Sequence, residues 1–295
     1  AWNDLHKLTN DENSDVRRGA SFDFGAAFSD LPDKQQAWND LHKLTNDEDS
    51  RVRSEVTSAI GSVFSDLPNK QQAWNDLHKL TNDENSDVRY SAASAIGSAY
   101  SHVPDKQQAW NDLHKLINDK NSWVRYSAVS AIGSAFSQVP DKQQAWNDLH
   151  KLSNDQDNNV RSQANHSLGK VSIFKAFQAE REENYKRELE TAIVFFEKAT
   201  RESYGWNNPA QFCLSFYRSF FSDLPNNQQA WNDLHKLTND ENSDVRYSAA
   251  SAIGSAYSHV PDKQQAWNDL HKLINDKNSW VRYSAVSAIG SAFSQ

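Results

Sequence analysis

The chain has 295 residues, and its 31 lysine and arginine residues against 39 aspartate and glutamate residues give a formal net charge of -8. This acidic balance argues against a general nucleic-acid binder, which needs clustered basic side chains to displace counterions. The sequence contains no apolar run of about 18 residues, the minimum length for a membrane-spanning helix, so no membrane span is predicted.

The single cysteine, Cys213, excludes an internal disulfide framework and fits a reducing compartment. A cytoplasmic location is therefore the expectation, with an extracellular one left open. Methionine is absent, even at position 1, and no basic-apolar leader opens the chain. We expect a sequence that is processed, engineered or cut from a longer one.

One eight-residue word, AWNDLHKL, begins at Ala1, Ala37, Ala73, Ala109, Ala145, Ala230 and Ala266. Successive copies are 36 residues apart, except for a step of 85 residues between Ala145 and Ala230. Residues 64–138 and 221–295 are identical apart from Lys70 against Asn227, which indicates a recent duplication or deliberate construction. A fixed period of this length is the signature of a repeat architecture.

Each copy predicts a hairpin of two helices, as the third copy illustrates. Pro68 suits a first-turn position, and the KQQAWNDLHKLT that follows places apolar residues at helical spacing without glycine or proline. The segment NDENSD then favours a turn, with Ser86 as the expected N-cap of the second helix and Asp87 near the positive end of its dipole. The buried stripe of that helix is expected at Val88, Ala92, Ala95, Ile96 and Ala99.

A hairpin of this size cannot cover its own apolar face, whereas stacked hairpins can. The sequence therefore predicts an all-α fold, an α-solenoid of stacked antiparallel helix hairpins. We expect five hairpins in residues 1–172, a degenerate hairpin in 173–222 and two further hairpins in 223–295, all in one continuous solenoid.

The stretch DVRYSAASAIG, residues 87–97, resembles the second helix of HEAT-like repeats, and the copies are similar to HEAT-like arrays of archaeal proteins. The resemblance implies right-handed stacking with the second helices on the concave side. It also implies a binding scaffold, although some members of the family are enzymes. A further implication is a ladder of aspartate and arginine side chains between neighbouring repeats. The matching residues are Asp11, Asp47, Asp83, Asp119, Asp155, Asp240 and Asp276, with Arg17, Arg53, Arg89, Arg125, Arg161, Arg246 and Arg282.

The 85-residue step contains an irregular insert. Residues 174–204 predict one long amphipathic helix with dense mixed charge on its polar face. A break at Gly205–Pro209 precedes a second helix that is rich in aromatic residues, between Phe212 and Phe221. These rings either fill a wider gap between two regular stacks or form a local pocket or partner groove. No base that could activate Cys213 is recognisable beside it.

Signals for catalytic or metal chemistry are weak. Seven histidines recur at one helical position, which is typical of a packing or surface position because metal ligands must converge on one point. The spacing Asp83-x-Asn85-x-Asp87 imitates a calcium loop but lacks its glycine and final glutamate. We therefore expect a non-enzymatic protein without a cofactor. An enzyme with a site in the aromatic insert is a remaining alternative.

The repeats differ at two neighbouring positions of the second helix. The position of Asp87 carries tryptophan in two other copies, and the position three residues later carries tyrosine in four. Residues three apart adjoin on a helix, and exposed tryptophan and tyrosine anchor protein interfaces. A protein or peptide is therefore expected to bind these residues, with packing against the adjacent repeat as the alternative. The candidate residues are Tyr90, Trp123, Tyr126, Tyr247, Trp280 and Tyr283.

A second hypothesis makes the chain a structural subunit. Neither the first nor the last hairpin has the polar face of a capping repeat, which solenoids need for solubility. Copies could then stack head to tail, and such a contact does not close and builds a filament. A shortened chain is the simpler explanation of both ends.

Overall fold

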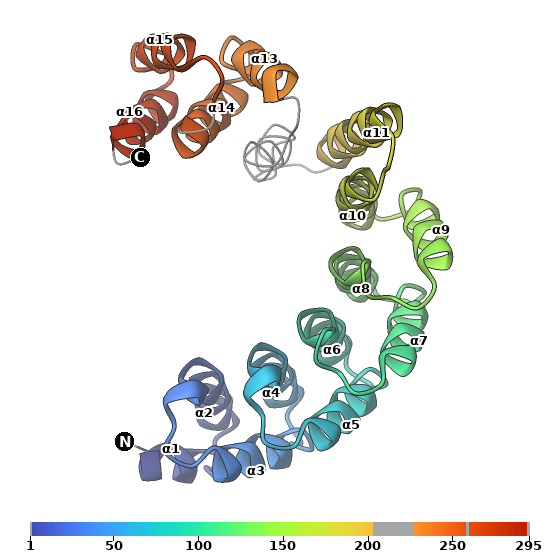
Figure 1. The fold of residues 1–295 in the computed structure, drawn as a ribbon. Helices are drawn as coiled ribbons and strands as arrows, with labels where there is room; N and C mark the ends of the chain where they lie inside the picture. Colours follow the sequence, from blue (N-terminus) through green and yellow to red (C-terminus); the bar gives the residue numbers. More distant parts are fainter. Residues whose placement is uncertain (1, 203–226, 258–259, 294–295) are drawn as a thin grey trace. The chain divides into compact units, whose positions relative to one another are not determined.

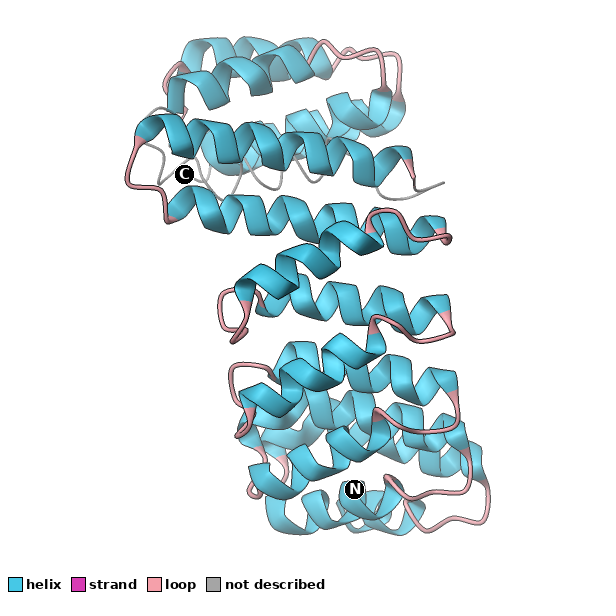
Figure 2. Ribbon diagram, turned by 90° about the vertical axis from the view of Figure 1, so that its right-hand side faces the viewer, coloured by secondary structure: helices cyan, strands magenta, loops and turns pink. Residues whose placement is uncertain are grey.

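The computed structural model describes residues 2–202, 227–257 and 260–293. Within these ranges every regular element is a helix, and no described residue forms a strand (Figures 1 and 2). The chain divides into two compact units, Ala1–Phe195 and Phe196–Gln295. The predicted break at Gly205–Pro209, the aromatic helix and Cys213 lie outside the described residues.

Unit 1 contains five hairpins, each made of an A helix and a B helix. The A helices are α1 (Trp2–Leu8), α3 (Lys34–Leu44), α5 (Lys70–Leu80), α7 (Lys106–Leu116) and α9 (Lys142–Leu152). The B helices are α2 (Ser14–Ala27), α4 (Ser50–Val63), α6 (Ser86–Ala99), α8 (Ser122–Ala135) and α10 (Asn158–Phe177). The short 3-10 helices η1 (Phe28–Asp30) and η2 (Phe64–Asp66) follow α2 and α4. Within this unit the B helices line the inner side of the curve and the A helices the outer side (Figure 1).

Unit 2 contains two hairpins of the same kind. Their helices are α13 (Asn227–Leu237), α14 (Ser243–Ala256), α15 (Lys263–Leu273) and α16 (Ser279–Phe293). Helix α11 (Glu182–Arg201) spans the border between the two units.

The helix caps lie one residue earlier than predicted. Asn85, and not Ser86, is the N-cap of α6, because its backbone is extended and its side chain accepts a hydrogen bond from the backbone N–H of Asp87. Ser86 is already helical, so its hydroxyl is not placed to accept from the free N–H groups of the first turn. Asn69 caps α5 in the same way, which leaves Pro68 before the cap and outside the first turn.

The prediction of one long helix from Phe174 is wrong, since α10 ends at Phe177 and α11 begins at Glu182. The residues before the break continue α10: the Phe174 ring packs edge-on against Phe136, with ring centroids 5.8 Å apart. The break falls next to the charged run EREE at 180–183, which offers no apolar side chain to either helix. No glycine or proline marks it, so the break depends on packing and not on a local sequence signal.

Neighbouring B helices pack closely through small residues. A Cβ atom added to Gly61 would lie 2.6 Å from the Cα of Ala95, and one added to Gly254 would lie 2.5 Å from the Cα of Ala288. Glycine at this position therefore permits the close approach of one B helix to the next. The predicted stripe of α6 is buried at all five of its positions.

Candidate protein-binding surface

An arginine–aspartate ladder joins successive repeats within each unit. Arg89 donates two hydrogen bonds to the Asp119 carboxylate, at 2.7 and 2.9 Å, and two more to the backbone carbonyls of Asp83 and Glu84. Bidentate charged pairs of this kind fix geometry as well as adding energy. The other pairs are Arg17–Asp47, Arg53–Asp83, Arg125–Asp155 and Arg246–Asp276.

Asp240, another of the residues matched to the ladder, lies in a local turn. Its carboxylate accepts from the backbone N–H of Asn242 at 2.8 Å, and its backbone carbonyl accepts from Arg246. One aspartate can serve both the turn and the ladder. The Asp83 carboxylate accepts hydrogen bonds from the backbone N–H of Asn85 and from the guanidinium of Arg53. These aspartates therefore shape the turn before a B helix. The ones that also receive the arginine of the preceding repeat are Asp47, Asp83, Asp119, Asp155 and Asp276.

A histidine–aspartate ladder along the A helices was missed by the sequence interpretation. His78 Nδ1 lies 2.7 Å from an oxygen of Asp112, which is buried, and the His78 ring packs on Trp74. The same contact joins His6–Asp40, His42–Asp76, His114–Asp148 and His235–Asp269. The signal was present, because every AWNDLHKL word carries both residues and each partner lies 34 residues further on. These five histidines therefore link one A helix to the next.

The candidate binding residues of unit 1 form what we call the concave aromatic patch: Tyr90 on α6, with Trp123 and Tyr126 on α8. The Trp123 side chain is 56% exposed and meets Tyr126 edge-on, with ring centroids 5.8 Å apart. Tyr126 is half-buried, and burial together with the nearby Tyr90 raises the pKa of its hydroxyl. Asn121 accepts from the backbone N–H of Trp123 at 2.8 Å, so α8 keeps its cap although the acid found in α6 is missing.

Unit 2 carries the same arrangement on α14 and α16. Trp280 is 69% exposed and Tyr283 is 65% exposed, with their ring centroids 6.3 Å apart, and Tyr247 is half-buried. Ser284 donates to the Tyr247 carbonyl at 2.8 Å, as Ser127 does to the Tyr90 carbonyl at 2.9 Å. The chain therefore presents two copies of one pair, an exposed tryptophan beside a tyrosine, and the tyrosine is half-buried in unit 1 and exposed in unit 2.

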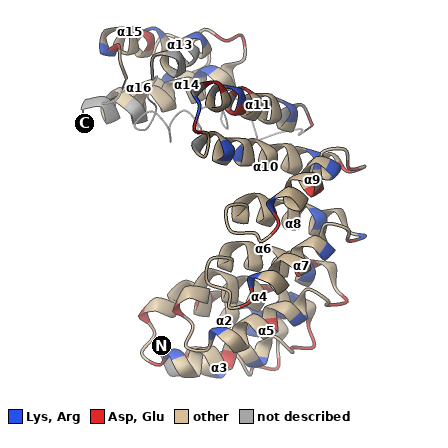
Figure 3. Cartoon of the chain, turned by 45° about the vertical axis from the view of Figure 1, so that its right-hand side comes forward, with Lys and Arg blue, Asp and Glu red and all other residues tan. Residues whose placement is uncertain are grey.

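A shallow groove of about 290 Å³ lies beside the concave aromatic patch, between α6 and α8. Tyr90 and Tyr126 border it, and its other polar side chains are serines: Ser94, Ser98, Ser127, Ser130 and Ser134. None of the residues that line this groove is charged. The remaining residues of α6 and α8 include few charged side chains (Figure 3). The groove offers serine hydroxyl groups and tyrosine rings. These groups suit an uncharged peptide segment, because the hydroxyl groups can form hydrogen bonds with its backbone N–H and C=O groups.

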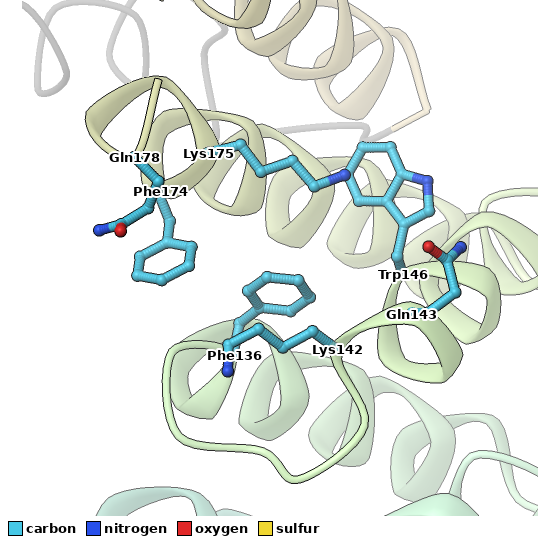
Figure 4. Close-up of a pocket in the computed structure, with 7 residues that line it drawn as sticks. All are labelled: Phe136, Lys142, Gln143, Trp146, Phe174, Lys175 and Gln178. Carbon is cyan, nitrogen blue, oxygen red and sulfur yellow. The ribbon is translucent and has the colours of Figure 1, made fainter. Parts of the chain in front are cut away.

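A second depression, the Trp146 pocket, was also missed by the sequence interpretation. It measures about 370 Å³ and lies where α8, α9 and α10 meet (Figure 4). Its lining residues are Phe136, Lys142, Gln143, Trp146, Phe174, Lys175 and Gln178. Its formation depends on the extra length of α10, which local sequence patterns did not indicate.

Among the residues that the structure describes, no group of three or more histidine, cysteine, aspartate or glutamate side chains is placed to hold a metal ion. None of the helices in 2–202, 227–257 and 260–293 combines the length and apolar character that crossing a bilayer requires.

Stacked helix hairpins joined by ladders between equivalent positions define the class of α-solenoid repeat proteins. The chain belongs to the HEAT-repeat family. Residues 2–196 match the family described as "Sister chromatid cohesion protein PDS5 protein", and residues 232–294 match the family described as "HEAT repeats". A comparison with curated proteins gave no match.

The fold is also similar to that of longer proteins of known structure. A chain in a homology model of the full-length AP-3 complex has a TM-score of 0.56 at 14% identity, covering 97% of this chain and 50% of that one. Kap121p has a TM-score of 0.46 at 14% identity, and the match covers 97% of this chain and 36% of Kap121p. Kap121p bound to Nup53p has a TM-score of 0.48 at 15% identity, and the match covers 98% of this chain and 32% of that one. This chain spans about a third to a half of their length, and at these identities the likeness concerns the fold alone.

Proposed function

We propose that the chain is a non-enzymatic scaffold that binds a protein or peptide through the concave aromatic patch and its copy in unit 2. The observation that carries this proposal is the exposure of Trp123 and Trp280, each beside a tyrosine. Tryptophan and tyrosine supply a large share of the binding energy at protein interfaces. The HEAT-repeat family, which consists largely of binding scaffolds, agrees with this role.

The fold itself does not need these rings. Asp87 occupies the position of Trp123 in the preceding repeat, and both helices begin with the same side-chain cap from asparagine. An exposed indole contributes little packing, and clustered exposed apolar side chains mark interaction sites. The uncharged groove next to Trp123 adds hydroxyl donors and acceptors that can pair with the backbone of a bound segment.

Changing both Trp123 and Trp280 to aspartate is expected to abolish binding without unfolding the chain. A peptide selected from a displayed library against the native chain supplies the probe, and its affinity for the double variant should fall more than tenfold. The melting temperature should stay within about 2 °C, because surface substitutions change stability by less than about 0.5 kcal/mol.

Phe22→Ser provides the matched control, since Phe22 is an exposed ring on α2 and the equivalent position of α6 is Ser94. This control should retain full binding. Retained binding by the double variant would contradict the proposal. A drop of many degrees in its melting temperature would show instead that the two rings pack on neighbouring repeats.

A second candidate function, self-assembly, is favoured by the surface of α16. Val286 is 61% exposed, whereas the equivalent Val129 of α8 is fully buried under the next repeat. Arg282 donates to the carbonyls of Asp276 and Lys277, while the equivalent Arg125 also binds the Asp155 carboxylate. A repeat that supplied an aspartate here would complete the ladder, whether it belongs to the same polypeptide or to a second copy.

Light scattering over a range of concentrations tests this second candidate. A mass that rises with concentration, and that returns to one chain in an Arg282→Glu variant, is the result that head-to-tail assembly predicts. A strictly monomeric chain at high concentration would contradict it.

A further inference from the structure

The Trp146 pocket exists because the repeat period fails at α10. The B helices α2, α4, α6 and α8 are 14 residues long, whereas α10 is 20 residues long. The extra turns place Phe174 across the pocket from Trp146 and bring the Lys175 ammonium to the Trp146 ring (Figure 4). The insert therefore builds a cavity at this point of unit 1.

Trp146 differs from its equivalents in the three preceding repeats. Trp38, Trp74 and Trp110 are buried, but Trp146 is only half-buried and borders the cavity. Its ring also meets Phe195 edge-on, with centroids 6.0 Å apart. With Phe136 and Phe174 on the opposite wall, the pocket offers three aromatic rings to an occupant.

Two lysines give the pocket a positive character. Lys175 Nζ lies 3.2 Å from the centroid of the Trp146 ring, a cation–π contact. Burial lowers the pKa of Lys175, and the charge of Glu188 opposes that shift, while Glu188 itself lies 3.9 Å from Arg187. Lys142 is exposed on the other side of the pocket. Neither lysine has a carboxylate within ion-pair distance in the described part of the chain.

We propose that the Trp146 pocket binds a peptide segment in which an aromatic side chain is flanked by carboxylates. The aromatic side chain enters between Trp146 and Phe174, where rings prefer edge-to-face and offset contacts. The volume of about 370 Å³ lies near the lower end for ligand sites, which suits one ring and not a large molecule. The flanking carboxylates meet Lys142 and Lys175.

The rim of the pocket favours a peptide over a free aromatic acid. Gln143 and Gln178 are exposed there, and each carboxamide both donates and accepts hydrogen bonds. A peptide backbone lying across the pocket has both N–H donors and C=O acceptors to match them, whereas a free acid has carboxylate acceptors but no N–H donor. This site uses α9, α10 and Phe136 at the C-terminal end of α8, and none of the residues of the concave aromatic patch lines it, so the two sites can be tested separately.

Calorimetric titration with the peptide acetyl-Asp-Asp-Phe-Asp-Asp-amide at low salt tests the proposal. The native chain should bind this peptide, and the Lys142→Gln/Lys175→Gln double variant should bind it at least tenfold more weakly. The control variant Lys34→Gln/Lys70→Gln changes lysines at the equivalent A-helix position of two earlier repeats, away from the pocket, and should bind as the native chain does. Phe174→Ala keeps both charges and should also lose binding.

Several results would overturn the proposal. The first is that a peptide with alanine in place of phenylalanine binds as tightly as the phenylalanine peptide. The second is that free 3-phenylpropionate binds as tightly as that peptide. The third is that the double lysine variant binds the peptide as tightly as the native chain does. Melting temperatures of all variants separate lost binding from lost folding. The Trp123→Asp/Trp280→Asp variant should still bind the acidic peptide, so failure of either site leaves the other testable.

Discussion

Replacing Arg89 with alanine is expected to lower the free energy of unfolding by about 3–5 kcal/mol, because the Asp119 carboxylate then stays buried without its counter-ion. Arg89 and Asp119 are both largely buried, and four hydrogen bonds from one guanidinium join α6, the turn before it and the next repeat. Urea unfolding followed by circular dichroism measures the change. Hairpins of a solenoid depend on their neighbours, so the loss should extend to adjacent repeats.

Arg51→Ala is the matched control, since the Arg51 side chain is 54% exposed in its pairs with Asp15 at 2.9 Å and with Asp49 at 2.7 Å. Exposed pairs contribute only about 0–1 kcal/mol, so this variant should unfold almost as the native chain does. Equal losses in the Arg51 and Arg89 variants would contradict a structural role for the ladder.

Acid should weaken the same ladder. Burial, the largest single effect, raises the pKa of Asp119, but the hydrogen bonds from Arg89, the hydrogen bond from the Asn121 N–H and the charge of Arg89 together lower it more, and the net pKa lies below the usual value. Asp47, Asp83 and Asp155 show the same balance. A carboxylate whose pKa is lower in the folded state stabilises the folded chain at pH values above its unfolded pKa of about 3.9. This stabilisation is lost as the pH falls through the folded-state pKa. The ladder's contribution to the unfolding free energy, measured as the difference between the native chain and the Arg89→Ala variant, should therefore hold steady from pH 7 to pH 5 and decline toward pH 3.

Adding one methyl group at Gly61 is the second change with a large expected effect. Gly61→Ala should destabilise the chain by about 1–3 kcal/mol, the usual cost of overpacking a tight contact. Its Cβ would lie 2.6 Å from both the Cα and the Cβ of Ala95, so the backbone of α4 or α6 has to shift. Thermal or urea unfolding measures the effect.

Gly19→Ala should act in the opposite direction. A Cβ added there meets no atom within 4 Å, and Gly19 lies inside α2. Removing glycine from a helix interior stabilises by about 0.5–1 kcal/mol. Equal effects of the two substitutions would contradict the close packing of the B helices.

The regular hairpins were predictable because each helix repeats the same apolar spacing. The stripe from Val88 to Ala99 follows from helical periodicity alone, and all of its members are buried. The caps were misplaced by one residue, since serine and asparagine both favour that region of the sequence. Only the observed hydrogen bond from the Asp87 N–H assigns the cap to Asn85.

Contacts between repeats were harder to predict. The proximity of Trp123 to Tyr126 follows from a spacing of three on one helix, but the exposure of Trp123 depends on how α8 packs on its neighbours. The contact between His78 and Asp112 joins two helices, so neither helix reveals it alone. The Trp146 pocket depends on where α10 ends, and that end has no local sequence signal.

The stoichiometry of peptide binding tests the central claim most directly. If the aromatic pairs at Trp123 and Trp280 are binding surfaces, calorimetric titration with the selected peptide should give two peptides per native chain. The Trp280→Asp variant should bind one peptide, and the Trp123→Asp/Trp280→Asp variant should bind none. An unchanged stoichiometry in the double variant would contradict the assignment of these surfaces.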